Sequence, residues 1–167
     1  GEKIAFAVSE SDLPKGKTIN TVYVMNKNGS SLINVSEKIE GANSPFWSSS
    51  DELYLMNKGQ VYKYSFDTGE ATQVTDFYAG VSDPILSNDE RYLAFTAELF
   101  LECGTDNDCN KRLDESTKNG PMQAYIADEL LFRHWTDYKG EKESYLVLFD
   151  IKENKYQAIT SSDVLSG

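Results

Sequence analysis

The stretches "SPFWSSSDELYLM" (residues 44–56) and "DPILSNDERYLAF" (residues 83–95) repeat one pattern at two places in the chain. Each runs from a proline through an apolar pair, a serine and an acidic turn into an alternating strand. Placing Pro45 over Pro84 aligns the copies at an offset of 39 residues without a gap. The other matched positions are Ser48 and Ser87, Asp51 and Glu90, Leu53 and Tyr92, and Met56 and Phe95. A fixed offset of this kind identifies an internal repeat.

A second repeated unit follows the first. Residues 21–36, 60–75 and 144–160 each contain an apolar strand that ends in Asn or Asp, a polar turn, and a strand that closes on Ser or Thr. In the first two copies the turn contains a glycine, which adopts a positive φ without strain and favours a hairpin. Ser36 and Thr75, two of the closing residues, are again 39 residues apart. The two units together predict four short antiparallel strands in every ~40 residues, which is typical of a β-propeller blade.

The predicted fold is therefore all-β, with residues 1–167 forming an incomplete β-propeller of about three four-stranded antiparallel blades. We place the blades at about 3–40, 44–78 and 82–160, and a long insertion at about 97–143 interrupts the third. Inside it, "CNKRLDESTKNG" predicts a short helix before Gly120 and Pro121, although an apolar face is nearly absent. Long insertions in a repeat map to loops on one face, which often carry function.

Three blades do not close a ring, because propellers have about four to eight blades and each blade buries a face against its neighbour. We therefore expect the chain to be part of a larger polypeptide that supplies the remaining blades. An unpaired blade face also favours self-association. The opening "GEKIAFAVSE" shows no signal peptide, and this says nothing about whether the natural protein is exported.

The chain is acidic, with 27 Asp and Glu against 16 Lys and Arg and a formal net charge of −11. Nucleic acids and anionic membrane surfaces attract basic proteins, so we expect neither as a partner. No apolar run reaches the roughly 18–20 residues that span a bilayer. We also predict no cofactor.

The two cysteines, Cys103 and Cys109, lie in "LECGTDNDCN" with turn-forming residues between them. A small loop-closing disulfide fits this spacing, and two reduced thiols or a pair of metal ligands are the alternatives. Zinc needs two more soft ligands, and the chain has one histidine, so we predict no metal site. Residues 106–110 begin like a calcium loop, but Lys111 and Thr117 occupy its glycine and glutamate positions.

The only histidine, His134, lies between Arg133 and Trp135 in "LLFRHWTDY". A histidine acting as a general base needs a substrate or nucleophile within reach and an orienting partner. The structural alternative is a packed histidine, an arginine paired with nearby carboxylates and a tryptophan packed between blades. The repeat favours this alternative, because it makes the segment the strand that re-enters the third blade after the insertion.

With repeat and insertion assigned, the chain resembles the N-terminal propeller part of prolyl-oligopeptidase-family (S9) serine peptidases, in their bacterial dipeptidyl-peptidase 5 and acylaminoacyl-peptidase branch. The resemblance is carried by "DPILSNDERYLAFTAE" (83–98), the cysteine-bearing loop and "AYIADELLFRHWTDYKGEKESYLVLFDIKENKYQAIT" (124–160). Arg133, His134 and Trp135 match the family pattern and serve as its markers. Thr136 stands where the family usually has aspartate. The first two blades are similar to any TolB-like propeller with PD40 repeats.

The resemblance implies a propeller that admits peptides to a C-terminal α/β-hydrolase domain, which would carry the catalytic Ser, Asp and His. This chain has one histidine and no Gly-x-Ser-x-Gly elbow, so we assign no catalytic residue to it and expect the hydrolase domain to be absent. Acidic propeller residues hold the substrate α-ammonium in relatives, which makes Glu98 or Glu102 the candidate anchor. Arg133 is the candidate partner for a substrate carboxylate.

The implied function is the non-catalytic, gating and substrate-selecting portion of a secreted or periplasmic serine exopeptidase. Such an enzyme removes dipeptides or acylated residues from peptide N-termini, so its partner is a peptide substrate that the hydrolase domain cleaves. The alternative is a TolB-like propeller binding module that docks a protein partner and has no attached enzyme. The complete gene separates the two, because only the peptidase continues into a domain with an elbow serine.

Overall fold

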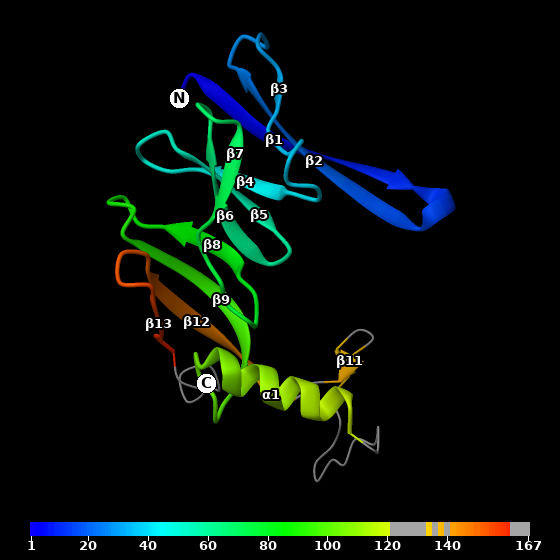
Figure 1. Ribbon diagram of the computed structural model, residues 1–167, viewed down its shortest axis with the longest axis vertical. Helices are drawn as coiled ribbons and strands as arrows, with labels where there is room; N and C mark the ends of the chain where they lie inside the picture. Colours follow the sequence, from blue (N-terminus) through cyan, green and yellow to red (C-terminus); the bar gives the residue numbers. More distant parts are fainter. Residues whose placement is uncertain (121–132, 135–136, 139–140, 161–167) are drawn as a thin grey trace. The chain divides into compact units, whose positions relative to one another are not determined.

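The computed structural model describes residues 1–120 and 141–160, together with the backbone of residues 133–134 and 137–138. These residues form β-sheets, one short 3-10 turn and one α-helix (Figure 1). The chain divides into two compact units, the first made of residues 1–76 and 86–92 and the second of residues 77–85 and those from 93 onward. The sequence-based assignment of an all-β fold is confirmed.

The first sheet has the strand order β1-β2-β3. Its strands are β1 (Lys3–Asp12), β2 (Lys17–Asn26) and β3 (Ile33–Asn34). β1 and β2 pair antiparallel in one unbroken register from Lys3↔Asn26 to Asp12↔Lys17. The 3-10 turn η1 (Leu13–Lys15) closes this hairpin, and the Asp12 carboxylate caps it by accepting from the Lys15 N–H at 3.2 Å. We expected four strands in this module, and the described residues contain three.

The second sheet has the order β4-β5-β6-β7 and matches the predicted four-stranded module. Its strands are β4 (Asn43–Trp47), β5 (Leu53–Asn57), β6 (Gln60–Ser65) and β7 (Glu70–Gln73). The pairing of β4 with β5 shifts register between Asn43 and Phe46, where Pro45 has no N–H for the ladder. Strand β5 is buried along its whole length.

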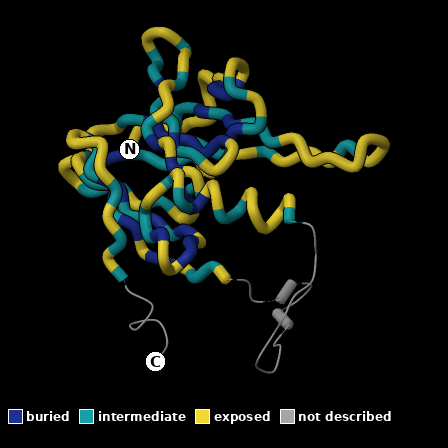
Figure 2. Tube along the Cα trace, turned by 60° about the horizontal axis from the view of Figure 1, so that its bottom comes forward, coloured by how far each residue is buried: buried dark blue, intermediate teal, exposed yellow. Residues whose placement is uncertain are grey.

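The core of the first unit lies between the first two sheets. Val22 and Val24 of β2 and Leu53 and Leu55 of β5 are at most 2% exposed and belong to one apolar cluster. Burying each such side chain stabilises the fold by roughly 1.5–3 kcal/mol relative to exposure. Figure 2 shows these buried segments in dark blue, surrounded by exposed turns. The alternation predicted from the sequence is therefore what directs these residues inward.

The third sheet has the order β13-β12-β9-β8. Its strands are β8 (Ser82–Leu86), β9 (Tyr92–Phe100), β12 (Lys142–Asp150) and β13 (Lys155–Ala158). Four aromatic rings pack on its buried face, with centroid distances of 4.7 Å for Phe77 and Tyr156, 4.3 Å for Phe149 and Tyr156, and 5.4 Å for Phe77 and Phe95. Aromatic contacts of this kind add to the stabilisation from burial.

The closing hydroxyls of the repeat make the same hydrogen bond in all three sheets. Ser36, Thr75 and Thr160 each accept from a backbone N–H fourteen residues earlier, at 2.9 Å in every case. The donors are Val22, Val61 and Leu146. These bonds define the equivalent positions of the three modules independently of the sequence alignment.

The gap-free alignment of residues 44–56 with residues 83–95 is wrong for the strands that follow the turn. In the turn 48–52 the first N–H donates to the last C=O at 2.9 Å, and in the turn 87–92 the equivalent bond measures 2.8 Å. The second turn therefore contains one more residue, and Leu53 corresponds to Leu93 and not to Tyr92. Both leucines are 0% exposed, so the alternation of buried side chains resumes correctly only with this extra residue.

Candidate functional site

The insertion of the third module begins with a tight loop between β9 and the helix α1 (Asn107–Lys118). A disulfide joins Cys103 and Cys109, whose Cα atoms are 5.5 Å apart, so the predicted disulfide is confirmed. The Asp106 carboxylate caps the helix by accepting from the Cys109 N–H at 2.9 Å. Cap and disulfide together hold the first turn of α1 against the end of β9.

Asn110 is the buried centre of this loop and is 2% exposed. Its side-chain oxygen accepts from the Phe100 N–H at 3.1 Å. Its amide donates to the carbonyls of Gly104 and Asp106, both at 2.8 Å. One side chain thus provides hydrogen-bond partners for backbone groups at the end of the strand, in the turn and at the N-cap of the helix. The predicted helix is confirmed, and these tertiary contacts replace the apolar face that it lacks.

Asp114, in the second half of α1, joins the helix to the neighbouring elements. Its carboxylate lies 2.6 Å from the Lys142 Nζ on β12 and accepts from the Tyr78 hydroxyl at 3.1 Å. Burial alone would raise the pKa of Asp114, but the hydrogen bond and charge of Lys142 outweigh it, so the pKa lies below its ordinary value of 3.8. The helix is therefore anchored by Asn110 in its first turn and by Asp114 one turn later, to the third sheet and to the segment before β8.

The two candidate anchors for a substrate amine lie on either side of the loop's start. Glu98 is an exposed residue near the end of β9, and Glu102 is an exposed residue in the turn that contains Cys103, immediately before that cysteine. No hydrogen bond or ion pair joins these two described side chains to each other. The loop holds Glu102 on a cross-linked turn, whereas Glu98 belongs to a strand.

The segment around the only histidine forms a hairpin of its own. β10 (Arg133–His134) pairs antiparallel with β11 (Asp137–Tyr138), and the two make a separate sheet. The strand that re-enters the third sheet is β12, so the interpretation of the His134 segment as that strand is wrong. The side chains of Arg133 and His134, and all of Trp135, lie outside the described residues.

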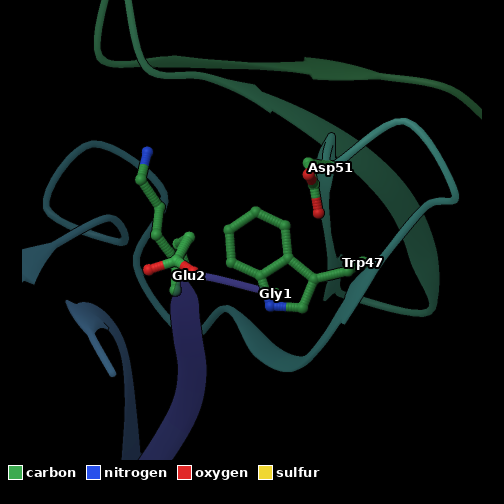
Figure 3. A pocket seen from close by; sticks show the side chains of 5 residues that line it. Gly1, Glu2, Trp47 and Asp51 are labelled. Carbon is green, nitrogen blue, oxygen red and sulfur yellow. The ribbon is translucent and has the colours of Figure 1, made fainter. Parts of the chain in front are cut away.

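A surface pocket of about 340 Å³ in the first unit was not predicted from the sequence. Figure 3 shows the Trp47 indole at its centre, with Glu2 on one side and Asp51 on the other. Glu2 is already paired with Lys27 at 2.6 Å, and the Lys3 Nζ lies 4.1 Å from the centre of the Phe66 ring. The pocket combines an aromatic surface with balanced charges, and the tryptophan that ends the "SPFW" strand was its only signal in the sequence.

The described residues contain no group of three or more His, Cys, Asp or Glu side chains placed to hold a metal ion. Glu98 on β9 and Glu102 and Asp106 in the loop that follows do not gather around one point. In the same part of the chain, no helix has the length and apolar character needed to cross a bilayer.

One three-stranded and two four-stranded sheets with equivalent closing bonds define the chain as an incomplete β-propeller, and a disulfide cross-links the start of the insertion in its third module. No known family model matches it. Dipeptidyl-peptidase 5 of Porphyromonas endodontalis is 22% identical over 143 residues, which cover 83% of this chain and 20% of that protein. The chain therefore spans about a fifth of the length of this curated relative.

Solved propeller structures superpose on nearly the whole chain. Acylaminoacyl peptidase of Pyrococcus horikoshii matches with a TM-score of 0.64 and 14% identity, covering 96% of this chain and 23% of that one. TolB of Acinetobacter baumannii gives 0.57 and 13%, covering 96% and 31%. The β-propeller domain of the Trilobed protease of Pyrococcus furiosus gives 0.53 and 13%, covering 96% and 40%. These structures establish the fold of the chain.

Proposed function

We propose that the chain is the non-catalytic propeller portion of a secreted or periplasmic serine exopeptidase, where it gates access and selects peptide substrates. The parent enzyme would remove dipeptides or acylated residues from peptide N-termini. The observation that carries this proposal is the match of 83% of the chain to one fifth of a dipeptidyl-peptidase 5. The catalytic serine, aspartate and histidine would come from a hydrolase domain, because this chain holds one histidine and no elbow serine.

Within this proposal Glu102 is the favoured anchor for the substrate α-ammonium, and Glu98 is the second candidate. A carboxylate on a cross-linked turn loses little conformational freedom when it binds a cation, which favours binding. The disulfide and the Asn110 side chain both immobilise the turn that carries Glu102. Arg133 remains the proposed partner for a substrate carboxylate.

The partners in this proposal are a peptide substrate, the hydrolase domain and the remaining blades. Export is supported by the disulfide, since such bonds persist in oxidising compartments. Cell fractionation of the native host tests the location. Recovery of the protein outside the periplasm and the medium would contradict it.

The alternative is a TolB-like propeller that docks a protein partner without any attached enzyme. The superposition on TolB at a TM-score of 0.57 supports this as a second candidate. The propeller sheets alone serve both functions equally well, so the distinction rests on the rest of the gene. A gene product with further blades and no hydrolase domain would favour the binding module.

The complete gene product tests the proposal when it is assayed with dipeptidyl and N-acylaminoacyl substrates. We expect both the peptidase activity and its loss when the elbow serine is replaced. Glu102→Gln should raise KM about tenfold for substrates with a free amine, since it removes a charged hydrogen bond, and change acyl-blocked substrates little. Glu115→Gln, at an exposed position of α1, is the matched control. A protein with an intact elbow serine that cleaves neither substrate class would contradict the proposal.

A further inference from the structure

The turn between β8 and β9 lies against the turn between β4 and β5, and both turns belong to the first unit. The Ser50 hydroxyl donates to the Glu90 carboxylate, and the Ser49 hydroxyl donates to the Asn88 carbonyl at 2.5 Å. Hydrogen bonds from Ser48 and Ser50 hold the pKa of Glu90 below its ordinary value of 4.5, so the carboxylate is ionised at neutral pH. One module is thus joined to the next by a carboxylate that accepts from a serine-bearing turn.

Asp51 is the equivalent of Glu90 in the second module. The two residues are 39 positions apart, and both have a positive φ, of 60° and 56°. The N–H of each bonds to the carbonyl of the serine three positions earlier, at 3.3 Å for Asp51 and 2.9 Å for Glu90. The extra residue of the second turn therefore follows Glu90 and leaves this match intact. Of the described residues, none donates a hydrogen bond to the Asp51 side chain.

The surface pocket of about 340 Å³ lies where Asp51 would make the equivalent contact. The closing hydroxyls and the strand pairings make Ala7 of β1 equivalent to Met56 of β5. Residues 1–3 therefore stand at the positions of residues 50–52. Residues 1–3 and Asp51 line this one pocket, on either side of an indole ring (Figure 3). The pocket thus corresponds to the place where two neighbouring turns meet.

The pocket offers an acceptor for a hydroxyl without an excess of charge. Gly1 stands at the position of Ser50 and has no side chain that could donate to Asp51. The charged side chains of Glu2 and Lys3 already have partners of their own. An uncharged donor therefore fits this pocket better than a cation, which would need more than one free carboxylate.

We propose that this pocket binds a hydroxyl-bearing turn of a further propeller module, with the Asp51 carboxylate as its acceptor. The contact repeats the one between the two observed turns, with a second hydroxyl donating to the Ser49 carbonyl, which is the equivalent of the Asn88 carbonyl. The pocket then serves the assembly of the propeller and does not bind a substrate. The inference goes beyond the proposed function, because both candidate functions require further modules.

An NMR titration of the isotopically labelled 167-residue chain tests the proposal. The probe is a synthetic peptide with the sequence of residues 43–52 carrying Trp47→Leu, which contains the three consecutive serines of the turn. We expect saturable shifts of the Trp47 indole N–H and the Asp51 backbone N–H. The N–H groups of β7 should change little, because β7 forms the opposite edge of the second sheet from β4. No saturable change at the pocket would overturn the proposal.

Matched changes in probe and chain isolate the hydroxyl contact. A probe with alanine at the three consecutive serines should bind about tenfold more weakly, because it cannot donate to the carboxylate. Asp51→Gly removes the acceptor where the positive φ suits glycine, and should weaken binding of the serine probe by the same factor. The alanine probe should bind Asp51→Gly and the unaltered chain equally. The control Asp67→Asn, at an exposed position, should bind like the unaltered chain. Independent losses from the two changes would overturn the proposal.

The observed contact between Ser50 and Glu90 can be tested as the precedent. Ser50→Ala and Glu90→Gln should each lower the equilibrium constant of folding, and the double variant should lose about fivefold less than the two single losses multiplied together. Multiplicative losses would remove the precedent and overturn the proposal. Pocket shifts that appear without probe and grow with protein concentration would identify a second copy as the occupant, which contradicts a further module. None of these measurements depends on peptidase activity.

Discussion

The hydroxyl of Thr75 accepts a hydrogen bond from the backbone N–H of Val61 at 2.9 Å, and the two residues are fourteen positions apart. The same hydroxyl donates to the Gln60 side-chain oxygen at 2.8 Å. Thr75 is 1% exposed and Val61 is 0% exposed, so water cannot replace the lost acceptor easily. The bond lies where the last strand of the module diverges from β6, and it completes the ladder there.

Replacing Thr75 with valine should therefore destabilise the chain. Thr75→Val keeps the shape of the side chain but leaves the Val61 N–H buried without its acceptor, which costs about 1–3 kcal/mol. The free energy of unfolding, measured by urea denaturation, should fall by this amount with an unchanged slope. Thr75→Ser keeps the hydroxyl and should cost less.

Thr160 provides an internal comparison for this prediction. It makes the equivalent 2.9 Å bond to Leu146, but in an exposed part of the third sheet. Water can hydrate the Leu146 N–H after Thr160→Val, so we expect a loss of only about 0.5 kcal/mol. If Thr160→Val and Thr75→Val cost the same, burial would not be the source of the effect.

The repeat could be predicted because its signal is local. Ser36 and Thr75 close equivalent strands and are 39 residues apart. Their hydrogen-bond donors, the N–H groups of Val22 and Val61, are separated by the same 39 residues. The extra residue before Leu93 could not be predicted, because Tyr92 and Leu93 are both apolar and either satisfies the strand pattern. Only the hydrogen bonds of the turn distinguish them.

The candidate site was harder to predict, because tertiary contacts determine it. The disulfide followed from the spacing of the cysteines, whereas nothing in the sequence marked Asn110 as a buried residue. The separate pairing of residues 133–134 with 137–138 depends on partners outside the repeat, so the repeat could not supply it. The functions of Glu98, Glu102 and Arg133 remain predictions from the family resemblance.

Removing the Asn110 side chain should disrupt the loop that carries Glu102. Asn110→Ala leaves the Phe100 N–H and the Gly104 carbonyl without the Asn110 side chain, whereas the Asp106 carbonyl keeps its bond from the backbone N–H of residue 110. We expect a loss of about 3 kcal/mol in the free energy of unfolding. Asn110→Asp keeps the shape but cannot donate, so it should also destabilise. The exposed Asp108→Asn in the first turn is the control and should change stability by less than about 0.5 kcal/mol. A loss at Asn110→Ala as small as the control would contradict the role of this side chain.

Removing the disulfide should lower the free energy of unfolding by less than removing the Asn110 side chain does. The loop closed by Cys103 and Cys109 is short, so the double variant with serine at both positions should lose about 2 kcal/mol of stability. The helix α1 should persist in its circular dichroism spectrum, because Asn110 still joins it to the strand. A thiol assay on the unfolded, unreduced chain should find no free thiol. Two free thiols, or a helix lost on reduction, would contradict this account.

The phenol of Tyr54 should make the chain sensitive to alkaline pH. Burial is the largest cause that raises its pKa from an ordinary value of 10.0 to about 12, and the negative charges of Glu90 and Glu52 and a hydrogen bond to Glu90 contribute to the same rise. A raised pKa means that folding favours the neutral phenol. Its stabilising contribution is therefore complete below pH 10 and is lost as the pH rises through about 12.

The measurement compares the free energy of unfolding of the unaltered chain and Tyr54→Phe between pH 9 and pH 12, within and just below the range in which Tyr54 titrates. The variant has no group to ionise at this position, so its stability should fall less steeply across the range. Tyr62→Phe is the control, because the Tyr62 ring is only half-buried on the neighbouring strand β6. Identical slopes for the unaltered chain and Tyr54→Phe would show that ionisation of Tyr54 is not coupled to folding.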